Sequence, residues 1–533
     1  MAEHDTSAVT KDTFYVTTPI YYLNDVPHIG HGYTTVAADV LARWRRLSGD
    51  RVHFLTGTDE HGEKNARAGR ERGMTPQGHV DDIVPRWHEM LRLLRISNDD
   101  FIRTTEPRHT ERVQQFMKRL YEQGDLYRGT YSGYYDVRSE TYYTEDELLP
   151  DEDGVRRLSP THGTPVELVE EENWFFRLSE YAPDLLKLYD ERPDFVQPKA
   201  RLNEVRSFVE AGLEDISATR SRLDWGVSVP WEPGHVFYVW FDALLNYITA
   251  AGYGSHPDAF ARRWPADVHL IGKDILRFHA VYWPAMLMAA GLEVPRQVYA
   301  HGFLLVAGAK MSKSNATGVH PATLVEHFGL DCYRYYFLRE ISFGQDGTFS
   351  WESMEQRYTT DLANDLGNLA NRVLTMVESY RGGTVPSAPD GGEPAHGEAE
   401  AALSAEVALA VAGLQVFDRL EFKRGLESLW VLVGGMNRYV EARRPWALNK
   451  AGEHAELDRC LATCVDALRI IAVVISPVMP DAAAALWEKL GLASLGSGWA
   501  LSAQRLPQAA EQGRTPAGLT VHRGDLLFPK LPE

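Results

Sequence analysis

Two short motifs far apart in the chain carry side chains suited to binding a polyphosphate. In His28-Ile29-Gly30-His31, which follows an apolar run, two imidazoles flank a glycine at an expected strand-to-helix turn, where they can hydrogen-bond phosphate oxygens. In Lys310-Met311-Ser312-Lys313-Ser314, two lysines in a polar stretch can neutralise charge that develops on a departing pyrophosphate. Together the motifs indicate a nucleoside triphosphate as ligand, with His28, Gly30, His31, Lys310 and Lys313 as the candidate residues.

These residues resemble the HIGH and KMSKS motifs of class I aminoacyl-tRNA synthetases, and within that class the chain is similar to the methionyl-tRNA synthetases. The similarity extends from about Phe14 to Trp446 and resumes at Leu526-Leu527-Phe528-Pro529-Lys530-Leu531. It implies ATP-dependent activation of methionine to methionyl-adenylate, followed by transfer to the 3′ end of initiator and elongator tRNA. One departure follows Ser314, where Asn315-Ala316-Thr317-Gly318 lacks the usual Gly-Asn pair of the family.

The resemblance also implies a methionine site and an adenosine site. An ammonium taken out of water needs a carboxylate partner, which Asp59 can supply, and aromatic rings suit a polarisable thioether. Spacing alone leaves an alternative open, since Trp240, Ala243 and Tyr247 could simply form a core stripe, and Tyr22 could be a core aromatic residue. The implied methionine-binding residues are Ile20, Tyr22, Asp59, Trp240, Ala243, Tyr247, Phe278 and His279, and the residues implied beside adenosine are Gly272, Lys273 and Asp274.

A second group of residues suits an unpaired RNA loop. Asn364, Asn368 and Arg372 are spaced by four, which places them on one face of an expected helix, and Trp446 follows an Arg-Arg-Pro sequence. Amides and guanidinium groups can read base edges, and an indole can stack on a splayed base. These residues match the anticodon reader of the family. The alternative is a solvated helix face and a Pro-Trp turn in the core, and a net charge of −19 also argues against nucleic acid.

The sequence favours a chain without structural zinc. Relatives often carry CxxC pairs in the region where this chain has Asp136-Val137-Arg138-Ser139 and Ser159-Pro160-Thr161-His162. Structural zinc needs a tetrahedral set of thiolate or imidazole ligands, which these residues do not supply. We therefore expect the inserted region to form a compact knuckle that holds no zinc. Separately, we expect magnesium to accompany ATP. The tyrosines expected to pack the knuckle are Tyr131, Tyr134, Tyr135, Tyr142 and Tyr143.

The order of apolar segments predicts the elements that position these residues. Residues 13–18 and 52–55 read as buried strands, and residues 33–48 and 77–95 have helical periodicity. Strand–helix alternation of this kind is typical of a parallel, doubly wound α/β sheet, here a Rossmann-like catalytic domain split by an insertion and followed by an α-helical bundle. The expected domains are 1–126 and 236–325 (catalytic), 127–235 (insertion), 326–360 (stem-contact linker) and 361–533 (anticodon-binding bundle).

Composition sets the remaining expectations. A hydrophobic content of 44% and a charged content of 24% are ordinary for a globular protein. Three cysteines are too few for a disulfide framework, so we expect a cytoplasmic protein with Cys460 and Cys464 in the core and without a membrane partner. The resemblance implies a monomer, because the dimer-forming C-terminal extension that some members of the family carry is not expected here. The alternative function is an ATP-dependent ligase or nucleotidyltransferase of the same fold without a tRNA role.

Overall fold

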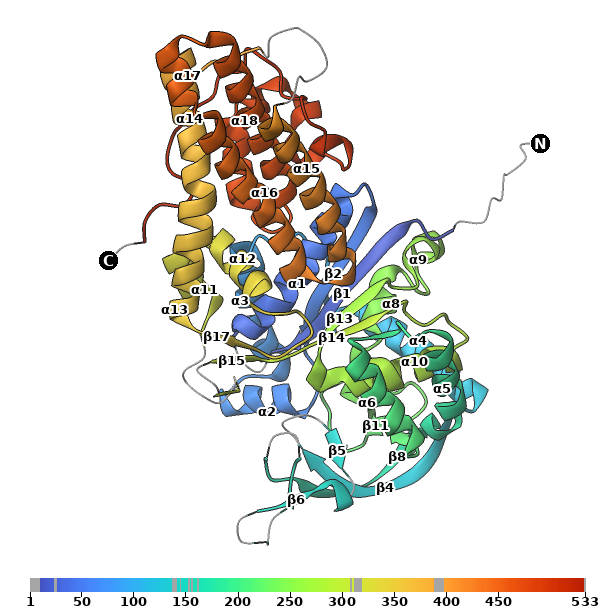
Figure 1. Ribbon diagram of the computed structural model, residues 1–533. Coiled ribbons are helices and arrows are strands. Elements are labelled where there is room, and N and C mark those ends of the chain that lie inside the picture. The colour runs from blue at the N-terminus through green and yellow to red at the C-terminus, as the bar shows by residue number, and fades with distance from the viewer. Residues whose placement is uncertain are drawn as a thin grey trace, which may run out of the picture. The chain divides into compact units, whose positions relative to one another are not determined.

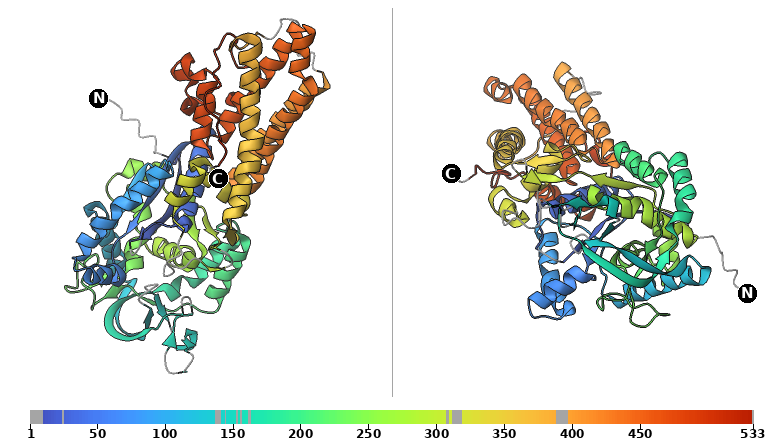
Figure 2. Two further views of the ribbon diagram at one scale, coloured as in Figure 1. Left: turned by 90° about the vertical axis from the view of Figure 1, so that its left-hand side faces the viewer. Right: turned by 90° about the horizontal axis from the view of Figure 1, so that it is seen from below.

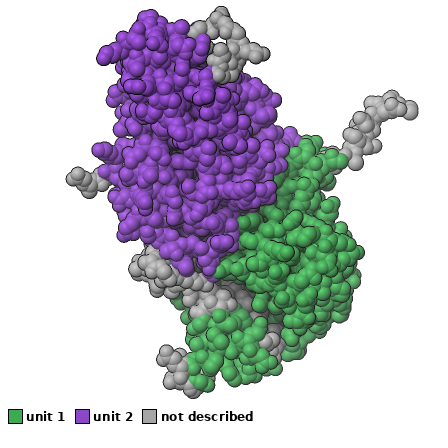
Figure 3. All heavy atoms as spheres, viewed as in Figure 1, with its two compact units in different colours: residues 1–27, 52–89, 98–301 green, residues 28–51, 90–97, 302–533 purple. Residues whose placement is uncertain are grey.

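The computed structural model resolves into two compact units, which are described separately (Figure 3). The first unit comprises residues 1–27, 52–89 and 98–301, and the second comprises residues 28–51, 90–97 and 302–533. The structure describes residues 10–23, 26–136, 141–143, 145–151, 154, 157–160, 163–306, 309–310, 319–387 and 397–531.

A six-stranded sheet organises the first unit (Figure 1), with the strand order β3-β2-β1-β13-β14-β9. Strands β1 and β13, β13 and β14, β14 and β9, and β2 and β3 pair in parallel, as in Val16 beside Val268 and Leu55 beside Asp100. The central strand β1 lies between β2 and β13, so the winding of the chain reverses there, and open α/β sheets bind ligands at such a point. The predicted doubly wound α/β fold is confirmed. The strands are β1 (Thr13–Tyr22), β2 (Arg51–Asp59), β3 (Asp100–Arg103), β9 (Val196–Gln197), β13 (Val268–Gly272) and β14 (Val298–His301).

Several boundaries differ from the sequence-based expectation. Strand β1 continues to Tyr22 instead of ending at residue 18, because Ile20, Tyr21 and Tyr22 are themselves good strand formers. The following helix α1 begins at Ile29, so the histidine motif occupies its first turn and not a loop. The helices of this part of the chain are α2 (Glu63–Glu71), α3 (Pro76–Leu93), α4 (Pro107–Gln123), α7 (Val239–Ala243), α8 (Asn246–Ala251), α9 (Pro257–Arg263) and α10 (Trp283–Ala289).

Within the region predicted to be an insertion, the structure contains a separate antiparallel sheet. Its strand order is β10-β8-β4-β5, and β4 pairs with β8 along its length from Leu126 beside Phe176 to Tyr135 beside Glu167. Its antiparallel pairing differs from the parallel pairing of the central sheet, as expected for an inserted region. The elements are β4 (Leu126–Asp136), β5 (Thr141–Tyr143), β6 (Leu149–Pro150), β7 (Arg157–Leu158), β8 (Glu167–Phe176), α5 (Ala182–Glu191), α6 (Lys199–Glu210), β10 (Ile216–Ser217), β11 (Thr219–Arg220) and β12 (Val236–Phe237).

The second unit is mainly helical. Helices α14, α15, α16 and α18 lie lengthwise beside one another (Figures 1 and 2), with α16 in contact with α14, α15 and α18. Its elements are α1 (Ile29–Leu47), β15 (Leu304–Val306), β16 (Ala309–Lys310), α11 (Pro321–Phe328), α12 (Leu330–Glu340), β17 (Gly347–Phe349), α13 (Trp351–Arg357), a π-helix (Tyr358–Gly367), α14 (Asn368–Arg381), α15 (Glu398–Gly413), α16 (Phe422–Arg443), α17 (Pro445–Ala451), α18 (His454–Ile475) and α19 (Pro480–Lys489).

A buried ion pair fixes α1, the helix that carries the two histidines. Asp39 of α1 lies 2.6 Å from a guanidinium nitrogen of Arg334 on α12, and neither side chain is exposed. The same guanidinium donates to the carbonyl oxygens of Leu94, Pro477 and Val478, so its buried donors are satisfied. Removing one partner of such a pair leaves an uncompensated buried charge. The position of α1 within this unit is therefore strongly specified.

Helix α15 is unusually apolar. The segment Glu398–Arg419 is long and apolar enough by composition to cross a membrane, which by itself is weak evidence. In the structure α15 packs along α16 and buries Leu403, Val407 and Ala410. The absence of a membrane partner stays a prediction. Cys460 and Cys464 are buried and free, as predicted.

Candidate active site

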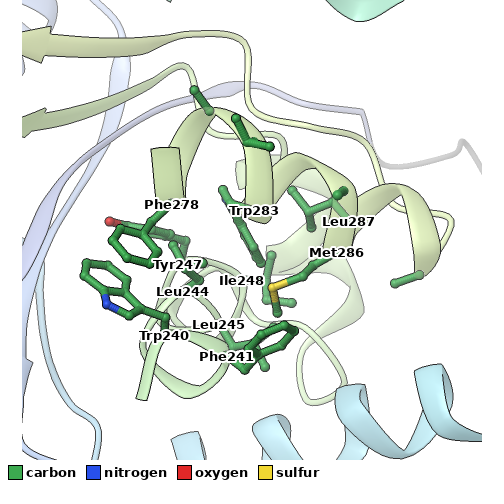
Figure 4. Close-up of a cluster of buried hydrophobic side chains, with 14 of the residues drawn as sticks. Trp240, Phe241, Leu244, Leu245, Tyr247, Ile248, Phe278, Trp283, Met286 and Leu287 are labelled. Atoms are coloured by element: carbon green, nitrogen blue, oxygen red, sulfur yellow. The ribbon is translucent and has the colours of Figure 1, made fainter. Parts of the chain in front are cut away.

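Two stacked aromatic rings form the wall of a buried cluster in the first unit. The rings of Trp240, on α7, and Phe278 lie with centroids 3.7 Å apart and planes 6° apart (Figure 4). Phe278 and His279 belong to a short π-helix, Phe278–Tyr282, that follows β13. Tyr247 from α8 joins the same cluster, and Ile20 and Tyr22 at the end of β1 pack against it. The stripe predicted from helical spacing is thus divided between two short helices, with Ala243 buried on the first.

Tyr247 and His279 are joined by a hydrogen bond whose direction follows from chemistry. The Tyr247 hydroxyl lies 2.7 Å from His279 Nε2, and His279 Nδ1 lies 3.0 Å from the carbonyl oxygen of Ile275. A carbonyl can only accept, so Nδ1 carries the proton of the neutral imidazole. His279 Nε2 must then accept the hydroxyl proton of Tyr247. The Tyr247 oxygen keeps its lone pairs, so it can act only as a hydrogen-bond acceptor towards other groups. The pair fixes the rotamer of Tyr247 within an otherwise apolar wall.

The buried histidines make stability fall in acid. Burial lowers the pKa of His279 from its usual 6.5 to about 4, and burial likewise lowers the pKa of His53 to about 4. The unfolded chain therefore binds protons that the folded chain does not, and the free energy of unfolding decreases as the pH falls from 6.5 towards 4. We expect a decrease of about 1.4 kcal/mol per pH unit for each such histidine.

Urea unfolding at a series of pH values checks this expectation. His279→Asn removes one titrating group and keeps a hydrogen-bonding side chain, so its stability should depend less steeply on pH than that of the unaltered chain. The difference between the two slopes isolates His279 from other groups that titrate in acid, including Asp331, whose pKa burial raises to about 6. Identical slopes would contradict the assignment of a neutral, buried His279.

Asp59 is the last residue of β2 and is buried at the carboxyl end of the sheet. The side-chain amide of Asn65 donates to the Asp59 carbonyl oxygen at 3.1 Å, which holds the backbone where the strand ends. Burial raises the pKa of Tyr247 far above its usual range, and the Asp59 carboxylate adds to that rise. Asp59 is thus a buried carboxylate near the aromatic cluster, and its role as the partner of a substrate ammonium group stays a prediction.

One buried carboxylate in this region was missed from the sequence. Asp242 lies on α7 two residues after Trp240, and its two oxygens lie 2.6 Å from His61 Nδ1 and 2.7 Å from His109 Nε2. Burial alone would raise the pKa of Asp242, but the two histidines lower it to about 2. Asp242 thus ties α7 to α4 and to the segment after Asp59. The available signal was a single carboxylate inside the apolar run from residue 239 to 245, because such a group needs partners.

The predicted adenosine-binding residues follow directly after β13. Gly272 ends the strand, and Lys273 and Asp274 belong to a short 3-10 turn, with Lys273 half-buried and Asp274 exposed. A Cβ atom at Gly272 would lie 2.4 Å from a carboxylate oxygen of Asp274. Asp274 is exposed and its carboxylate could move aside, so the contact alone does not require glycine at this strand end. The position is one where open α/β sheets place their ligands.

The two histidines of the first motif cap α1 in the second unit. The Gly30 N–H donates to His28 Nδ1 at 3.1 Å, and the His28 N–H donates to His31 Nδ1 at 3.2 Å. Since both Nδ1 atoms accept, each neutral imidazole carries its proton on Nε2 and presents an N–H donor there. The ring centroids lie 3.8 Å apart, and the first turn of α1 has no acidic residue. Paired donors at the positive end of a helix suit phosphate oxygens.

The structure describes only the start of the lysine motif. The backbone of Lys310 lies in β16, beside Leu305 of β15. Lys313 lies outside the described residues, as does the altered segment after Ser314. The role of both lysines stays a prediction.

The predicted RNA-reading residues lie on the helical bundle of the second unit. Asn364 and Asn368 are exposed, although Asn364 belongs to the π-helix that precedes α14 and not to a regular α-helix. Arg372 on α14 pairs with Glu441 of α16 at 2.6 Å. Trp446 is 38% exposed at the start of α17, while the preceding Pro445 is buried. The indole therefore does not belong to the core, contrary to the alternative interpretation of the Pro-Trp sequence.

The part of the knuckle that the structure describes is held by strand pairing and buried polar contacts. Tyr134 pairs with Tyr143 across β4 and β5, and Thr164 donates to the buried Asp136 carboxylate at 3.0 Å. Among the described residues of the chain there is no group of three or more histidine, cysteine or acidic side chains that could hold a metal ion. Residues 137–140, 161 and 162 and the side chains of Tyr131 and Tyr142 lie outside the description, so the zinc-free knuckle stays a prediction.

Two family models together match most of the chain. The model described as "tRNA synthetases class I (M)" matches residues 14–151 and 155–374. The model described as "Anticodon binding domain of methionyl tRNA ligase" matches residues 388–533. The second match covers helices α15 to α19 and does not support the alternative of a ligase without a tRNA role.

Individual relatives and solved structures agree with the family models. The methionine–tRNA ligase of Streptomyces coelicolor is 50% identical over 100% of this chain and 99% of its own length, and that of Caldanaerobacter subterraneus is 46% identical over 98% and 79%. Mycobacterium tuberculosis methionyl-tRNA synthetase in complex with methionyl-adenylate is 42% identical, with a TM-score of 0.91 over 97% of this chain and 100% of that one. The chain therefore belongs to the methionyl-tRNA synthetases, a family of class I aminoacyl-tRNA synthetases.

Proposed function

We propose how individual residues of the chain carry out the reaction of a methionine–tRNA ligase. In the first step a carboxylate oxygen of methionine attacks the α-phosphorus of ATP, and pyrophosphate leaves. In the second step a terminal ribose hydroxyl of the tRNA attacks the carbonyl carbon of methionyl-adenylate, and AMP leaves. Alignment and charge stabilisation suffice for both steps, so the protein needs no covalent intermediate.

The buried aromatic cluster around Trp240 and Phe278 is the observation that supports the choice of methionine. Trp240 and Phe278 provide flat apolar surface, Ala243 leaves room beside them, and Ile20 and Tyr22 complete the wall. A thioether gains about 0.3–1.5 kcal/mol from each aromatic contact. Tyr247, fixed by His279, supplies a hydroxyl oxygen, and Asp59 binds the α-ammonium group.

Phosphate binding is assigned to the two motifs. His28 and His31 donate from Nε2 to ATP phosphate oxygens, beside the backbone at Gly30. Lys310 and Lys313 neutralise the pyrophosphate as it leaves, with a magnesium ion bound to the nucleotide. Gly272, Lys273 and Asp274 contact the adenosine.

The helical bundle recognises tRNA through a small set of exposed side chains. Asn364, Asn368 and Arg372 read anticodon base edges, and Trp446 stacks on one base. A local reader of this kind is compatible with the net charge of −19, because it does not need a broad basic surface. We extend the proposal to initiator and elongator tRNA, to the domain boundaries given above, to a monomeric state and to a cytoplasmic location.

A zinc-free knuckle is a further part of the proposal. We expect elemental analysis of the purified protein to find well below one zinc ion per chain, because Asp136 is engaged by Thr164 and the region lacks cysteine. Treatment with a chelator should leave the activation rate unchanged once magnesium is restored. Stoichiometric zinc, or loss of activity that only zinc restores, would contradict this prediction.

Pyrophosphate exchange tests the assignment of the substrate. Labelled pyrophosphate should enter ATP when methionine is present, and not with the other standard amino acids at equal concentration. Exchange should need no tRNA, and charging should require the methionine tRNA. Exchange supported better by a different amino acid would overturn the assignment of the aromatic pocket.

A further inference from the structure

Arg443 is the last residue of α16 and precedes the turn that presents Trp446. Its Nη2 atom donates to Glu456 Oε2 of α18 at 2.5 Å, and its Nε atom lies 3.0 Å from Glu400 Oε1 of α15. The Tyr439 hydroxyl, one turn earlier on α16, donates to the same Glu400 oxygen at 3.1 Å. The guanidinium group therefore ties the end of α16 to two neighbouring helices.

The turn itself has a backbone conformation that needs support. Arg444 has a φ of 47°, in the left-handed region that residues other than glycine rarely adopt. Its N–H closes α16 by donating to the Val440 carbonyl oxygen at 3.0 Å, and its own carbonyl accepts from the Ala447 N–H at 2.7 Å as α17 begins. Such a residue persists only when its surroundings fix it. Arg443, Arg444 and Pro445 therefore determine where the indole of Trp446 is presented.

The contact with Glu400 is largely withdrawn from solvent. The Glu400 side chain is 9% exposed, and its second oxygen, Oε2, is buried without a hydrogen-bond partner in the described part of the chain. Arg443 is the cation in contact with this carboxylate. A buried carboxylate that loses its cation is costly, so the bundle around the turn would have to rearrange.

We propose that Arg443 is a positioning residue for tRNA recognition, which holds the turn at Arg444 so that Trp446 meets an unpaired base. The inference rests on the proposed function of Trp446 as the base-stacking residue. Arg443 acts through the turn and not by contact with the RNA. Its planar guanidinium group hydrogen-bonds Glu456 through Nη2 and places Nε 3.0 Å from Glu400 without a hydrogen bond, an arrangement that a lysine ammonium group reproduces less well.

The chain offers a matched control on the same two helices. Arg438 of α16 pairs with Glu406 of α15 at 2.5 Å, and the Arg438 side chain is 66% exposed. This pair joins α15 to α16 as Arg443 and Glu400 do, but its arginine is exposed, its Glu406 side chain is 20% exposed, and it does not adjoin the turn. Arg438→Gln therefore controls for weaker packing between the two helices.

The test measures methionine-dependent pyrophosphate exchange and tRNA charging for the full chain carrying Arg443→Gln, Arg443→Lys or Arg438→Gln. We expect Arg443→Gln to leave exchange unchanged and to raise the KM for tRNA about 10-fold, since it forfeits part of the stacking of one base. The KM for tRNA of Arg443→Lys should lie between those of Arg443→Gln and the unaltered chain, and the KM of Arg438→Gln should stay close to that of the unaltered chain. Equal effects of Arg438→Gln and Arg443→Gln would reduce Arg443 to a packing role and overturn the proposal.

A double-mutant cycle with Trp446→Ala separates the inference from the function on which it rests. If Arg443 acts through Trp446, adding Arg443→Gln to Trp446→Ala changes charging little further. Fully additive effects would mean a separate role for Arg443, such as direct phosphate contact, and would overturn the inference. If Trp446→Ala itself leaves charging intact, the proposed stacking role fails. If only Arg443→Gln is without effect, the positioning role alone fails.

Discussion

Asp59→Asn is expected to lower kcat/KM for methionine in pyrophosphate exchange by about 100- to 1,000-fold, because a buried ammonium group without a carboxylate partner costs about 3–5 kcal/mol. The substitution keeps the size of the side chain and its place at the end of β2, which the Asn65 amide holds through the Asp59 backbone. The loss should appear with methionine and with methionyl-adenylate analogues that carry the ammonium group. Analogues that lack the ammonium group should bind about equally well to Asp59→Asn and to the unaltered chain.

Asp190→Asn is the matched control for this prediction. Asp190 lies in the same unit, and its side chain is exposed and pairs with Arg206 at 2.5 Å. Exposed pairs contribute about 0–1 kcal/mol, so exchange should be almost unchanged. A similar activity of Asp59→Asn and Asp190→Asn would remove Asp59 from the methionine site and leave it as a residue of the strand end.

The centre of the sheet was predictable from the sequence because its strands are rich in apolar and β-branched residues. The runs predicted at residues 13–18 and 52–55 are the neighbouring strands β1 and β2, and the strand-end position of Asp59 follows from that topology. The edge strand β9 has two residues, which are too few for an apolar pattern to be recognised in the sequence. The helical start at Ile29 was missed because the cap is provided by two histidines, which are not usual N-cap residues.

The candidate site could be predicted from the sequence only in part, because its helices depart from regular α-helical geometry. The spacing of Trp240, Ala243 and Tyr247 predicted one helix face, whereas the chain breaks the helix at Leu244–Leu245. The π-helices that contain His279 and Asn364 do not follow a period of 3.6 residues, so their side-chain directions could not be derived from spacing. The partners of Asp242 come from residues 61 and 109, and contacts between segments so far apart are set by the tertiary fold.

Trp446→Ala is expected to lower kcat/KM for tRNA charging by about 10- to 100-fold, since stacking of one base on an aromatic ring contributes about 1–3 kcal/mol. Pyrophosphate exchange without tRNA should be unchanged, because the residues proposed to bind methionine belong to the other unit. Trp446→Phe keeps an aromatic face and should retain most of the charging activity. Leu409→Ala, which removes an exposed apolar side chain from α15 of the same bundle, controls for the loss of apolar surface alone.

The exposure of Trp446 is what makes this effect specific. A tryptophan that is 38% exposed next to a buried proline contributes less to the core than a buried one, so its removal should change the free energy of unfolding little. A transcript with an altered anticodon should be charged poorly by the unaltered chain and hardly worse by Trp446→Ala, because the stacked base no longer contributes. Loss of charging that is equal for both transcripts would instead place the role of Trp446 in the stability of the bundle.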